Sequence, residues 1–444
     1  MGGTSSRPIR SLNAKIGRPV VCQYCCKVFQ RSTTFRVLYE HFDHCVIEVS
    51  VGAAKAKAFE VQSMSFQDKA KWLRGQLNEL RISWTADRIQ LVVKRDNLLD
   101  LSFTQVMQLS PRDVQKEFYV VFEGEAASDA GGVTRVWLNL LTENIFSQEV
   151  GLFQPCNTEV VSYSIRPHKH SNDMFIFAGR VLGKALLENV SVPCYFSKIL
   201  FKHLTQQKIE LEDLRFLDSQ LYKSLVFIKE NSIDGLALNQ FAVIKTEDDF
   251  QVLYELKPGG CDIELDDSNK AEYIELRLKF ETEKYFSEGL KSLLEGFWQV
   301  VPKEIIQLLH HDELELMLCG LPWIDTTNWR EFTVYRGVYD KDHEVIQWFW
   351  EVVDNLPQKE LGNLLQFCTG SNRMPPEGFS SFKTLRGHSA PFTIDPVILK
   401  NGFAYPRAHT CFNRLDLPMY ASKETLQKAL AFVIENSNLE FGIE

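Results

Sequence analysis

Apolar residues recur at helical spacing in several stretches of the chain beyond residue 65. Ser65 precedes the first stretch and Asp68 lies three residues after it, which is the pattern of a helix N-cap. The apolar face of this helix consists of Phe66, Ala70, Leu73, Leu77 and Leu80. The same spacing predicts helices over residues 175–187, 284–294 and 344–353, and a last helix from a cap at Ser422 to near Asn436.

Short runs with strand character lie between these helices. Residues 89–93 and 119–122 are rich in β-branched and aromatic side chains. No repeat period and no long low-complexity linker interrupts the pattern. The pattern therefore predicts an α+β fold that is mostly helical.

The composition is that of a folded, soluble protein. The chain has 444 residues, of which 45% are hydrophobic and 24% are charged. No stretch approaches the roughly 20 apolar residues that cross a bilayer, and the N-terminus has no apolar run typical of a signal peptide. Ten scattered cysteines favour reduced thiols over a disulfide framework. We therefore expect a cytoplasmic protein, and the net charge of -9 argues against a nucleic-acid partner.

The first 39 residues are basic, unlike the rest of the chain. They contain seven Lys or Arg residues and no acid, and residues 1–20 are expected to form a basic, disordered N-terminus. The opening MGGTSS places Gly2 and Ser6 as in an N-myristoylation signal. One acyl chain holds a membrane only weakly, so the basic cluster would act as the second signal. Partial membrane association through myristoylated Gly2 is one hypothesis, and an ordinary solvated tail is the other.

Residues 21–48 hold a cluster of candidate zinc ligands. The four ligands are Cys22, Cys25, His41 and Cys45. A Cys-x-x-Cys turn and a His-x-x-x-Cys helical turn can place four ligands tetrahedrally around a zinc ion. The segment is similar to a Cys-Cys-His-Cys zinc finger, with His44 or Cys26 as a substitute ligand. Free cysteines in a loose arm are the alternative interpretation.

The stretch RAHTCFNRLDLPMY, residues 407–420, contains Cys411 in a predicted loop before a strand and the last helix. A cysteine is nucleophilic as its thiolate, and neighbouring positive charge or hydrogen-bond donors lower its pKa from about 8.5. His409 and Thr410 are suitable donors. Spacing alone leaves two interpretations open: a nucleophile, or a core cysteine beside Phe412.

Several short motifs occur in a fixed order between residue 65 and the chain end. The segment HTCFNRLDLP, from His409 to Pro418, fits an active-site signature of the form H-T-C-F-N followed by leucines and a proline. It is preceded by FEGEAASDAGGVTRVW, AGRVLGKAL, LKPGGCDIELDDSNKAEYIEL, HDELELMLCG and FCTGSNRMPPEGF. In these motifs the chain resembles the catalytic domain of the HECT ubiquitin ligases, over roughly residues 65–444.

This resemblance implies a bilobal α+β HECT fold. A mostly helical N-lobe over residues 65–332 would dock the ubiquitin-charged conjugating enzyme, and a smaller α/β C-lobe over residues 337–444 would carry Cys411. The segment FTVYRG would be the flexible hinge between them, with Gly337 as its pivot. A hinge suits the implied chemistry, because one sulfur must meet a donor thioester and then an acceptor lysine.

The resemblance also implies the reaction of a HECT-type ubiquitin-protein ligase. Cys411 would accept ubiquitin from a conjugating enzyme as a thioester and pass it to a lysine of a protein substrate. His409 and Thr410 would orient or tune the first attack. Asp416 is a candidate to orient the lysine, although an acid at this position also suits an exposed turn. Catalysis would need no cofactor, since ATP is used upstream by the activating enzyme.

The tail NLEFGIE places Phe441 close to the chain end. In HECT ligases a phenylalanine at this distance is implied in lysine transfer, through packing across the two lobes. The alternative is that Phe441 closes the core of the C-lobe. The chain departs from the common family pattern at Tyr405, where leucine is expected, and at TRVW, where an Arg and an acid are frequent.

Two rivals to the ligase hypothesis come from other functional classes. A ubiquitin-pathway scaffold or binding module would keep the HECT-like body, transfer no ubiquitin and act through the zinc finger. Such a scaffold could dispense with Cys411. A thiol hydrolase would release ubiquitin to water instead of moving it to lysine.

Overall fold

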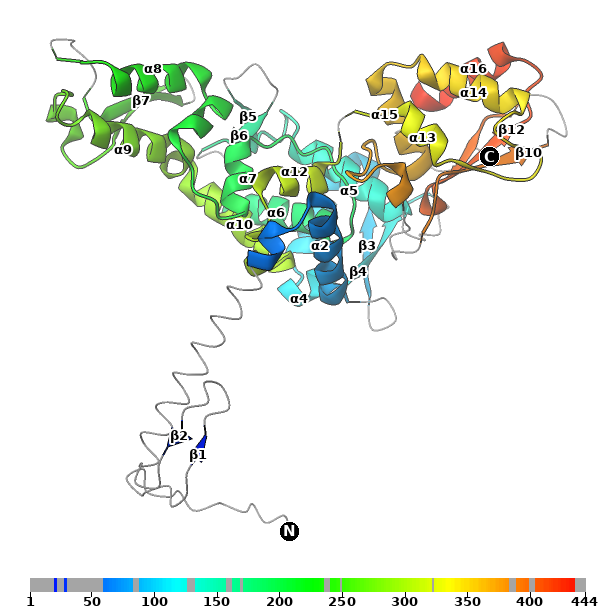
Figure 1. Ribbon diagram of the computed structural model, residues 1–444, viewed down its shortest axis with the longest axis horizontal. Helices are drawn as coiled ribbons and strands as arrows, with labels where there is room; N and C mark the ends of the chain where they lie inside the picture. The colour runs from blue at the N-terminus through cyan, green and yellow to red at the C-terminus, as the bar shows by residue number, and fades with distance from the viewer. Residues whose placement is uncertain are drawn as a thin grey trace. The chain divides into compact units, whose positions relative to one another are not determined.

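The computed structural model describes most of the chain from residue 59 onward (Figure 1). The described residues are 20–21, 28–29, 59–82, 88–125, 132–156, 162–167, 171–234, 240–247, 250–321, 323–382, 389–398 and 404–435. The chain divides into two compact units, Met1–Lys69 and Ala70–Glu444.

The first unit contains one pair of short strands and the start of a helix. Strands β1 (Val20–Val21) and β2 (Val28–Phe29) pair antiparallel. Ser65 caps helix α2 (Phe66–Leu80), because its hydroxyl accepts a hydrogen bond from the backbone N–H of Asp68 (3.2 Å) and donates one to the Asp68 carboxylate (2.7 Å). The predicted capped helix is therefore confirmed.

The second unit mixes many helices with short strands. Its helices after α2 are α3 (Leu98–Met107), α4 (Pro111–Val114), α5 (Gly132–Ile145), α6 (Asn172–Leu187), α7 (Lys198–Leu204), α8 (Ser219–Glu230), α9 (Lys270–Thr282), α10 (Ser287–Val300), α11 (Lys303–Ile306), α12 (His311–Cys319), α13 (Thr326–Glu331), α14 (Glu344–Asp354), α15 (Gln358–Thr369) and α16 (Lys423–Glu435). Its strands are β3 (Arg88–Val93), β4 (Glu117–Phe122), β5 (Phe153–Pro155), β6 (Tyr163–Ile165), β7 (Ala242–Glu247), β8 (Phe250–Glu255), β9 (Val334–Tyr335), β10 (Thr393–Val397), β11 (Arg407–His409) and β12 (Arg414–Pro418). The expected α+β class is confirmed.

Helices α6 and α10 pack with their backbones in close contact. A Cβ on Gly296 of α10 would lie 2.0 Å from the carbonyl oxygen of Ile176, and a Cβ on Gly179 of α6 would lie 2.2 Å from that of Leu293. Real Cβ atoms do not approach a carbonyl oxygen so closely, so only glycine fits at these two positions. The motif AGRVLGKAL thus supplies one side of a tight helix crossing.

Strands β3 and β4 form a parallel pair beside helices α3 and α5. Trp137 of α5 is fully buried there. Its indole Nε1 donates to the Ser102 hydroxyl (2.9 Å), and its ring meets that of Phe118 edge to face at 5.9 Å. Trp137, in the segment TRVW that departs from the common family pattern, is therefore a core residue.

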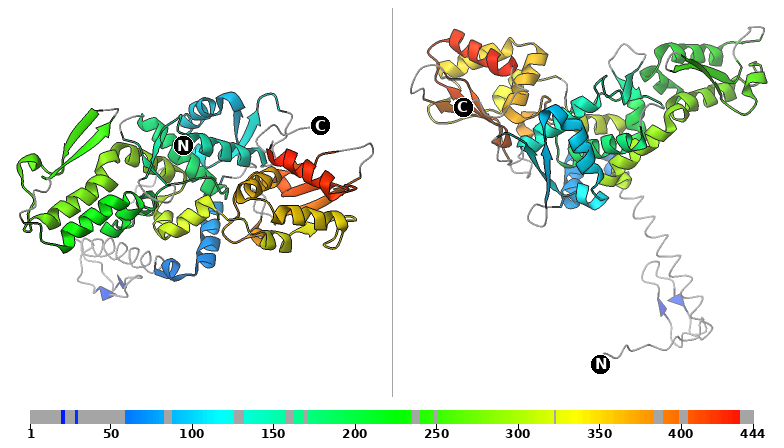
Figure 2. Two further views of the ribbon diagram at one scale, coloured as in Figure 1. Left: turned by 90° about the horizontal axis from the view of Figure 1, so that it is seen from above. Right: turned by 180° about the vertical axis from the view of Figure 1, so that it is seen from behind.

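Helices α8 and α9 and the β7–β8 hairpin share a smaller core of their own (Figure 1, Figure 2). The hairpin is antiparallel, with Val243 opposite Tyr254 and Ile244 opposite Leu253. Val243 is buried in this core, whereas Ile244 and Leu253 are exposed. Successive side chains of a strand point to opposite faces, so the hairpin has one buried face and one face toward solvent, on which the Ile244–Leu253 pair lies.

Buried hydrophobic residues from the segment 324–434 form a third core. Its four-stranded sheet has the order β11-β12-β10-β9, in which β12 is antiparallel to β11 and parallel to β10. Helices α14, α15 and α16 belong to the same body (Figure 2). Leu415 and Leu417 of β12 are buried in the core. Tyr405, at the position where leucine is common, packs against this core and stacks on Phe432 at 4.2 Å.

Most predicted helix bounds agree with the structure to within a few residues, and one differs in kind. Residues Lys284–Phe286 form a 3₁₀ turn, and helix α10 begins only at Ser287. The chain turns here from α9 into α10, and a short 3₁₀ segment is a common connector between two helices. The apolar spacing continued through this turn, so it could not reveal the break.

Candidate active site

Cys411 is the central residue of a 3₁₀ turn, Thr410–Phe412, that connects β11 to β12. The turn is closed by a hydrogen bond from the Asn413 backbone N–H to the Thr410 carbonyl oxygen (3.4 Å). Thr410 is buried and Phe412 is 57% exposed. The backbone of Cys411 thus lies at the end of a strand pair, before β12 and α16.

His409 and Asp416 face each other across this strand pair. The Nε2 atom of His409 lies 2.9 Å from Oδ2 of Asp416. Nε of Arg414 lies 3.1 Å from the other oxygen of Asp416, as an ion pair without hydrogen-bond geometry. The Asp416 carboxylate therefore has an imidazole on one oxygen and a guanidinium near the other.

The chemistry of this pair depends on which atoms are protonated. An ionised carboxylate can only accept, so Nε2 of His409 donates the hydrogen and Nδ1 of a neutral ring keeps its lone pair. The side chains of His409 and Asp416 are 40% and 20% exposed, so an incoming molecule can reach them. An imidazole oriented by a carboxylate in this way can accept a hydrogen bond or a proton from a group bound beside it.

Asn413 fixes the far end of the Cys411 turn. Its backbone has a positive φ of 50°, in the left-handed region where asparagine is tolerated. Its side chain is buried, and Nδ2 donates to the carbonyl oxygen of Ala390 (2.8 Å). Its Oδ1 accepts from Nη1 of Arg135 in helix α5 (3.1 Å), and the same Nη1 lies 3.3 Å from the Thr369 carbonyl oxygen.

Neither Asn413 nor Arg135 was predicted as a site residue. Both belong to quoted motifs, HTCFN and GGVTRVW, and this was the only signal in the sequence. A second link from α5 runs from Nδ2 of Asn139 to the carbonyl oxygen of Gly370 (2.6 Å). Helix α5 therefore donates to two consecutive carbonyl oxygens at the C-terminal end of α15, those of Thr369 and Gly370, and to Asn413 at the end of the Cys411 turn.

Other cysteines among the described residues are poorly suited to nucleophilic attack. Cys368 of α15 is completely buried, and burial raises the pKa of its thiol. Burial also raises the pKa of Cys194, whose carbonyl oxygen accepts a hydrogen bond from the Cys319 thiol (3.1 Å). Burial keeps such thiols protonated, and the thiol is the unreactive form.

Several predicted residues lie outside the described part of the chain. They are Gly2, the zinc-ligand candidates Cys22, Cys25, His41 and Cys45 with their substitutes Cys26 and His44, and Phe441. Within the described ranges, no helix is both long and apolar enough to cross a membrane.

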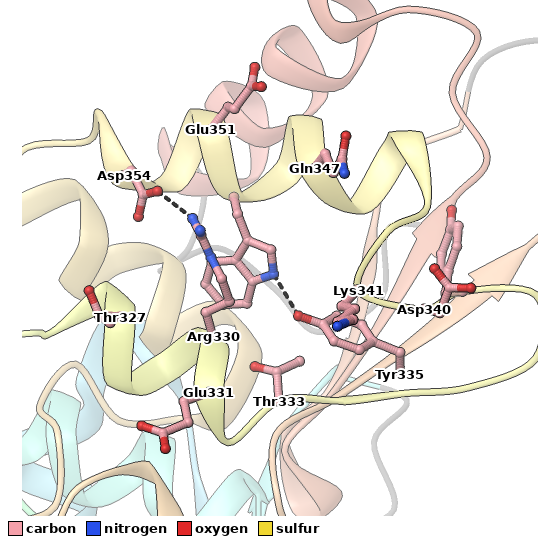
Figure 3. A pocket seen from close by; sticks show the side chains of 12 residues that line it. Thr327, Arg330, Glu331, Thr333, Tyr335, Asp340, Lys341, Gln347, Glu351 and Asp354 are labelled. Atoms are coloured by element: carbon pink, nitrogen blue, oxygen red, sulfur yellow. Dashed lines mark hydrogen bonds and ion pairs between the residues drawn. The ribbon is translucent and has the colours of Figure 1, made fainter.

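The predicted hinge runs along a pocket of about 910 Å³ (Figure 3). The indole N–H of Trp350 donates to the Tyr335 hydroxyl (2.8 Å), and Arg330 lies over the Trp350 ring and pairs with Asp354. Gly337 has a positive φ of 61°, and a Cβ there would lie 2.8 Å from Cγ of Pro396. The residues that line this pocket do not include the Cys411 turn, so the two features are separate.

Comparison with known proteins gives one consistent family. Residues 139–444 match the family model "HECT-domain (ubiquitin-transferase)". E3 ubiquitin-protein ligase HECW2 of Homo sapiens is 34% identical over 398 residues, which is 88% of this chain and 25% of that protein. E3 ubiquitin-protein ligase pub1 of Schizosaccharomyces pombe is 35% identical over 358 residues, which is 79% of this chain and 46% of that protein.

A third relative, E3 ubiquitin-protein ligase Nedd-4 of Drosophila melanogaster, is 34% identical over 377 residues, 81% of this chain and 36% of that protein. The chain thus spans less than half of the length of these relatives. The family model covers the Cys411 turn, helix α15 and the second half of helix α5, which includes Asn139, while Arg135 lies just before its first residue. The chain belongs to the HECT-domain (ubiquitin-transferase) family.

Proposed function

We propose that the chain is a HECT-type E3 ubiquitin ligase with Cys411 as its nucleophile. The observation that supports this most directly is the His409–Asp416 pair, which lies across the two strands that Cys411 joins. It is a partly exposed imidazole and carboxylate beside a cysteine turn, in a chain of the HECT family. The proposed partners are ubiquitin, a conjugating enzyme and protein substrates.

Two group transfers make up the proposed reaction. The Cys411 thiolate attacks the carbonyl carbon of the conjugating-enzyme thioester and releases the enzyme's own thiolate, so a thioester replaces a thioester. A deprotonated lysine amine then attacks the new carbonyl and releases the Cys411 thiolate, and an amide forms. The second step gives direction, because the amide is the more stable bond.

Roles for the neighbouring groups follow from their positions. His409 and Thr410 would orient the first attack from the strand end and turn that hold Cys411. Asp416 would orient the lysine or take its proton, since its carboxylate is partly exposed and held by His409 and Arg414. These groups would need no cofactor.

The test is a mixture of the protein with a conjugating enzyme charged with ubiquitin. Wild-type protein should form a reductant-sensitive ubiquitin adduct, and Cys411→Ala should form none. Cys368→Ala is the matched control, because Cys368 is a buried cysteine of the core that also holds Leu415 and Leu417, and this change should leave the adduct intact. A ubiquitin adduct that still forms in the Cys411→Ala variant would contradict the assignment of Cys411 as the nucleophile.

The same mixture separates the proposal from its rivals. A scaffold would form no adduct in the wild type. A thiol hydrolase would form an adduct but release free ubiquitin without modifying lysine. Ubiquitin transferred to lysine is the outcome expected here.

Docking of the conjugating enzyme is proposed for the solvent face of the β7–β8 hairpin. Ile244 and Leu253, directly opposed on this face, are 61% and 55% exposed. Phe250 at the hairpin end is 75% exposed, but it lies opposite Glu247 and belongs by alternation to the other face. Large exposed apolar side chains that gather in one place mark protein-interaction sites. A partner that covers them would gain roughly 1.5–3 kcal/mol for each side chain.

Three further proposals concern residues outside the described ranges. Phe441 would pack across the lobes during lysine transfer, so the Phe441→Ala variant should form the thioester normally and transfer ubiquitin to lysine slowly.

One structural zinc ion would be bound by Cys22, Cys25, His41 and Cys45, which metal analysis of Cys22→Ser tests. Myristoylated Gly2 would attach part of a cytoplasmic pool to membranes, which fractionation of Gly2→Ala tests.

A further inference from the structure

Three potential metal ligands are adjacent at the start of helix α12. They are His310, His311 and Asp312, and their ligand atoms all lie within 4.8 Å of one another. The two imidazole rings lie side by side, with centroids 4.1 Å apart. None of these residues takes part in the reaction proposed above.

The spacing of the ligand atoms fits one small ion. Nδ1 of His310 lies 3.3 Å from Oδ2 of Asp312, and Nδ1 of His311 lies 3.2 Å from Oδ1. Zinc bonds of about 2.0–2.2 Å in a tetrahedron place neighbouring ligand atoms roughly 3.3–3.6 Å apart. The observed separations are near that edge length, but each ring faces a different oxygen of Asp312, so one ion would be bound through both carboxylate oxygens or after a turn of the carboxylate.

The Nδ1 atoms of the two histidines can donate electron pairs to a cation. Nδ1 of His310 accepts a long hydrogen bond from the Asp312 backbone N–H (3.5 Å), so it carries a lone pair, which a bound ion would take over from this N–H. His311 is 7% exposed, and among the described residues its buried Nδ1 has no hydrogen-bond partner. Buried polar atoms are normally satisfied, and an ion bound in the native protein is one of the explanations for an exception.

Lys198 already places one positive charge here. Its Nζ, at the start of helix α7, lies 2.9 Å from Oδ1 of Asp312. The ammonium reaches one carboxylate oxygen but cannot accept electron pairs from the imidazoles as a metal ion does. The positive end of the helix dipole also opposes a bound cation. We therefore expect moderate affinity, limited by competition with Lys198.

We propose that His310, His311 and Asp312 bind a divalent transition-metal ion, with zinc as the preferred ion and water completing its coordination. Two imidazoles and one carboxylate suit zinc, copper or nickel better than magnesium or calcium, which prefer oxygen ligands alone. An open position filled by water is consistent with a three-ligand site whose His310 side chain is 52% exposed. This site is independent of the cysteine cluster at residues 22–45.

The proposal can be tested by equilibrium dialysis of the full chain against buffered Zn²⁺ at pH 7.5, where imidazole is largely neutral. The key variant is His310→Asn, because asparagine retains the N-cap and removes the ligand. The matched control is His343→Asn: His343 caps α14 through the same kind of bond, from Val345 N–H to its Nδ1 (3.2 Å). Zinc held at residues 22–45 would be equal in all variants and cancels in the difference.

We expect His310→Asn to bind one zinc ion fewer, or to bind it at least about tenfold more weakly, with His343→Asn like the wild type. Lys198→Met should bind zinc more tightly, because the competing ammonium is gone. Equal zinc binding by the wild type and His310→Asn would overturn the proposal. Equal losses in His310→Asn and His343→Asn, or weaker binding in Lys198→Met, would also overturn it.

Discussion

The Nε2 atom of His409 lies 2.9 Å from Oδ2 of Asp416, with the Cys411 turn between their two strands. Register explains this contact: His409 is opposite Arg414, and Asp416 is two residues further along β12 on the same face of the sheet. The buried Leu415 and Leu417 hold the opposite face in the core. The strand pairing therefore fixes an imidazole–carboxylate pair near the proposed nucleophile.

The first prediction is that Asp416→Asn slows lysine transfer more than it slows thioester formation. The amide keeps the size of the side chain and removes the negative charge that would attract and orient the lysine amine. Hydrogen bonds to charged groups contribute about 1.5–3 kcal/mol, so we expect a loss of roughly tenfold to a hundredfold in discharge. Single-turnover discharge of preformed thioester onto free lysine measures this step alone.

Asp395→Asn is the matched control for this prediction. Asp395 lies beside Asp416 in the parallel pairing of β10 with β12 and is 3.7 Å from Nη1 of Arg414. The structure shows no contact between Asp395 and His409 within the described residues. A discharge rate reduced equally in both variants would mean that general charge on this face matters, and not the carboxylate held by His409.

The second prediction concerns Ile244 and Leu253 on the solvent face of the β7–β8 hairpin. Ile244→Asp and Leu253→Asp should raise the concentration of charged conjugating enzyme needed for half-maximal thioester formation by about tenfold, since each removes apolar contact area. The maximal rate should change little, because these side chains are proposed to bind and not to react. Thr104→Asp on α3 adds the same charge at another exposed position and should have no effect. A drop in maximal rate without a change in half-saturation would contradict the docking role.

Local patterns account for the parts of the fold that the sequence predicts. The Ser65 and Ser422 caps lie within a few residues of the helices they start, and both are present in the structure. The 3₁₀ turn at Lys284–Phe286 depends on how α9 and α10 pack, and the apolar spacing of residues 284–294 carries no sign of that packing. Tertiary packing overrides local pattern at such connections.

The same distinction applies to the candidate site. The Cys411 turn is encoded in ten consecutive residues, HTCFNRLDLP, and could be found from the sequence. The hydrogen bond between Arg135 and Asn413 joins residues 278 positions apart, so no local spacing in the sequence predicts it. The His409–Asp416 contact requires the register of β11 on β12, which a sequence motif alone does not fix.

The third prediction is a pH dependence of stability through His203. Burial lowers the pKa of this histidine, while its Nε2 lies 2.7 Å from the carbonyl oxygen of Thr282. A folded-state pKa below the unfolded value of about 6.5 means that the unfolded chain takes up the proton first as the pH falls. The stabilisation from the neutral ring is therefore present above pH 6.5 and is lost as the pH falls toward the folded-state pKa.

Comparison with a variant that does not titrate isolates this effect. Wild type and His203→Gln should differ in free energy of unfolding by an amount that shrinks on acidification, with a limiting slope of about 1.4 kcal/mol per pH unit. Urea denaturation at pH 7.5, 6.5 and 5.5 measures the difference. A constant difference at the three pH values would refute the role of His203.

The last prediction separates the backbone and side-chain contributions of Asn413 to stability. Alanine at φ 50° would cost about 1–2 kcal/mol in backbone strain, and loss of the side-chain amide would leave the Ala390 carbonyl oxygen unsatisfied at about 1–3 kcal/mol. Glycine removes the strain but not the second loss. The free energy of unfolding should therefore fall in the order wild type, Asn413→Gly, Asn413→Ala. Asn189→Gly is the control, because Asn189 has φ 53° and its exposed side chain loses only a surface hydrogen bond from Nε of Arg74 (3.2 Å). Stability of Asn413→Gly equal to that of the wild type would mean that its bonds to Ala390 and Arg135 contribute nothing to folding, and the turn would then depend on backbone conformation alone.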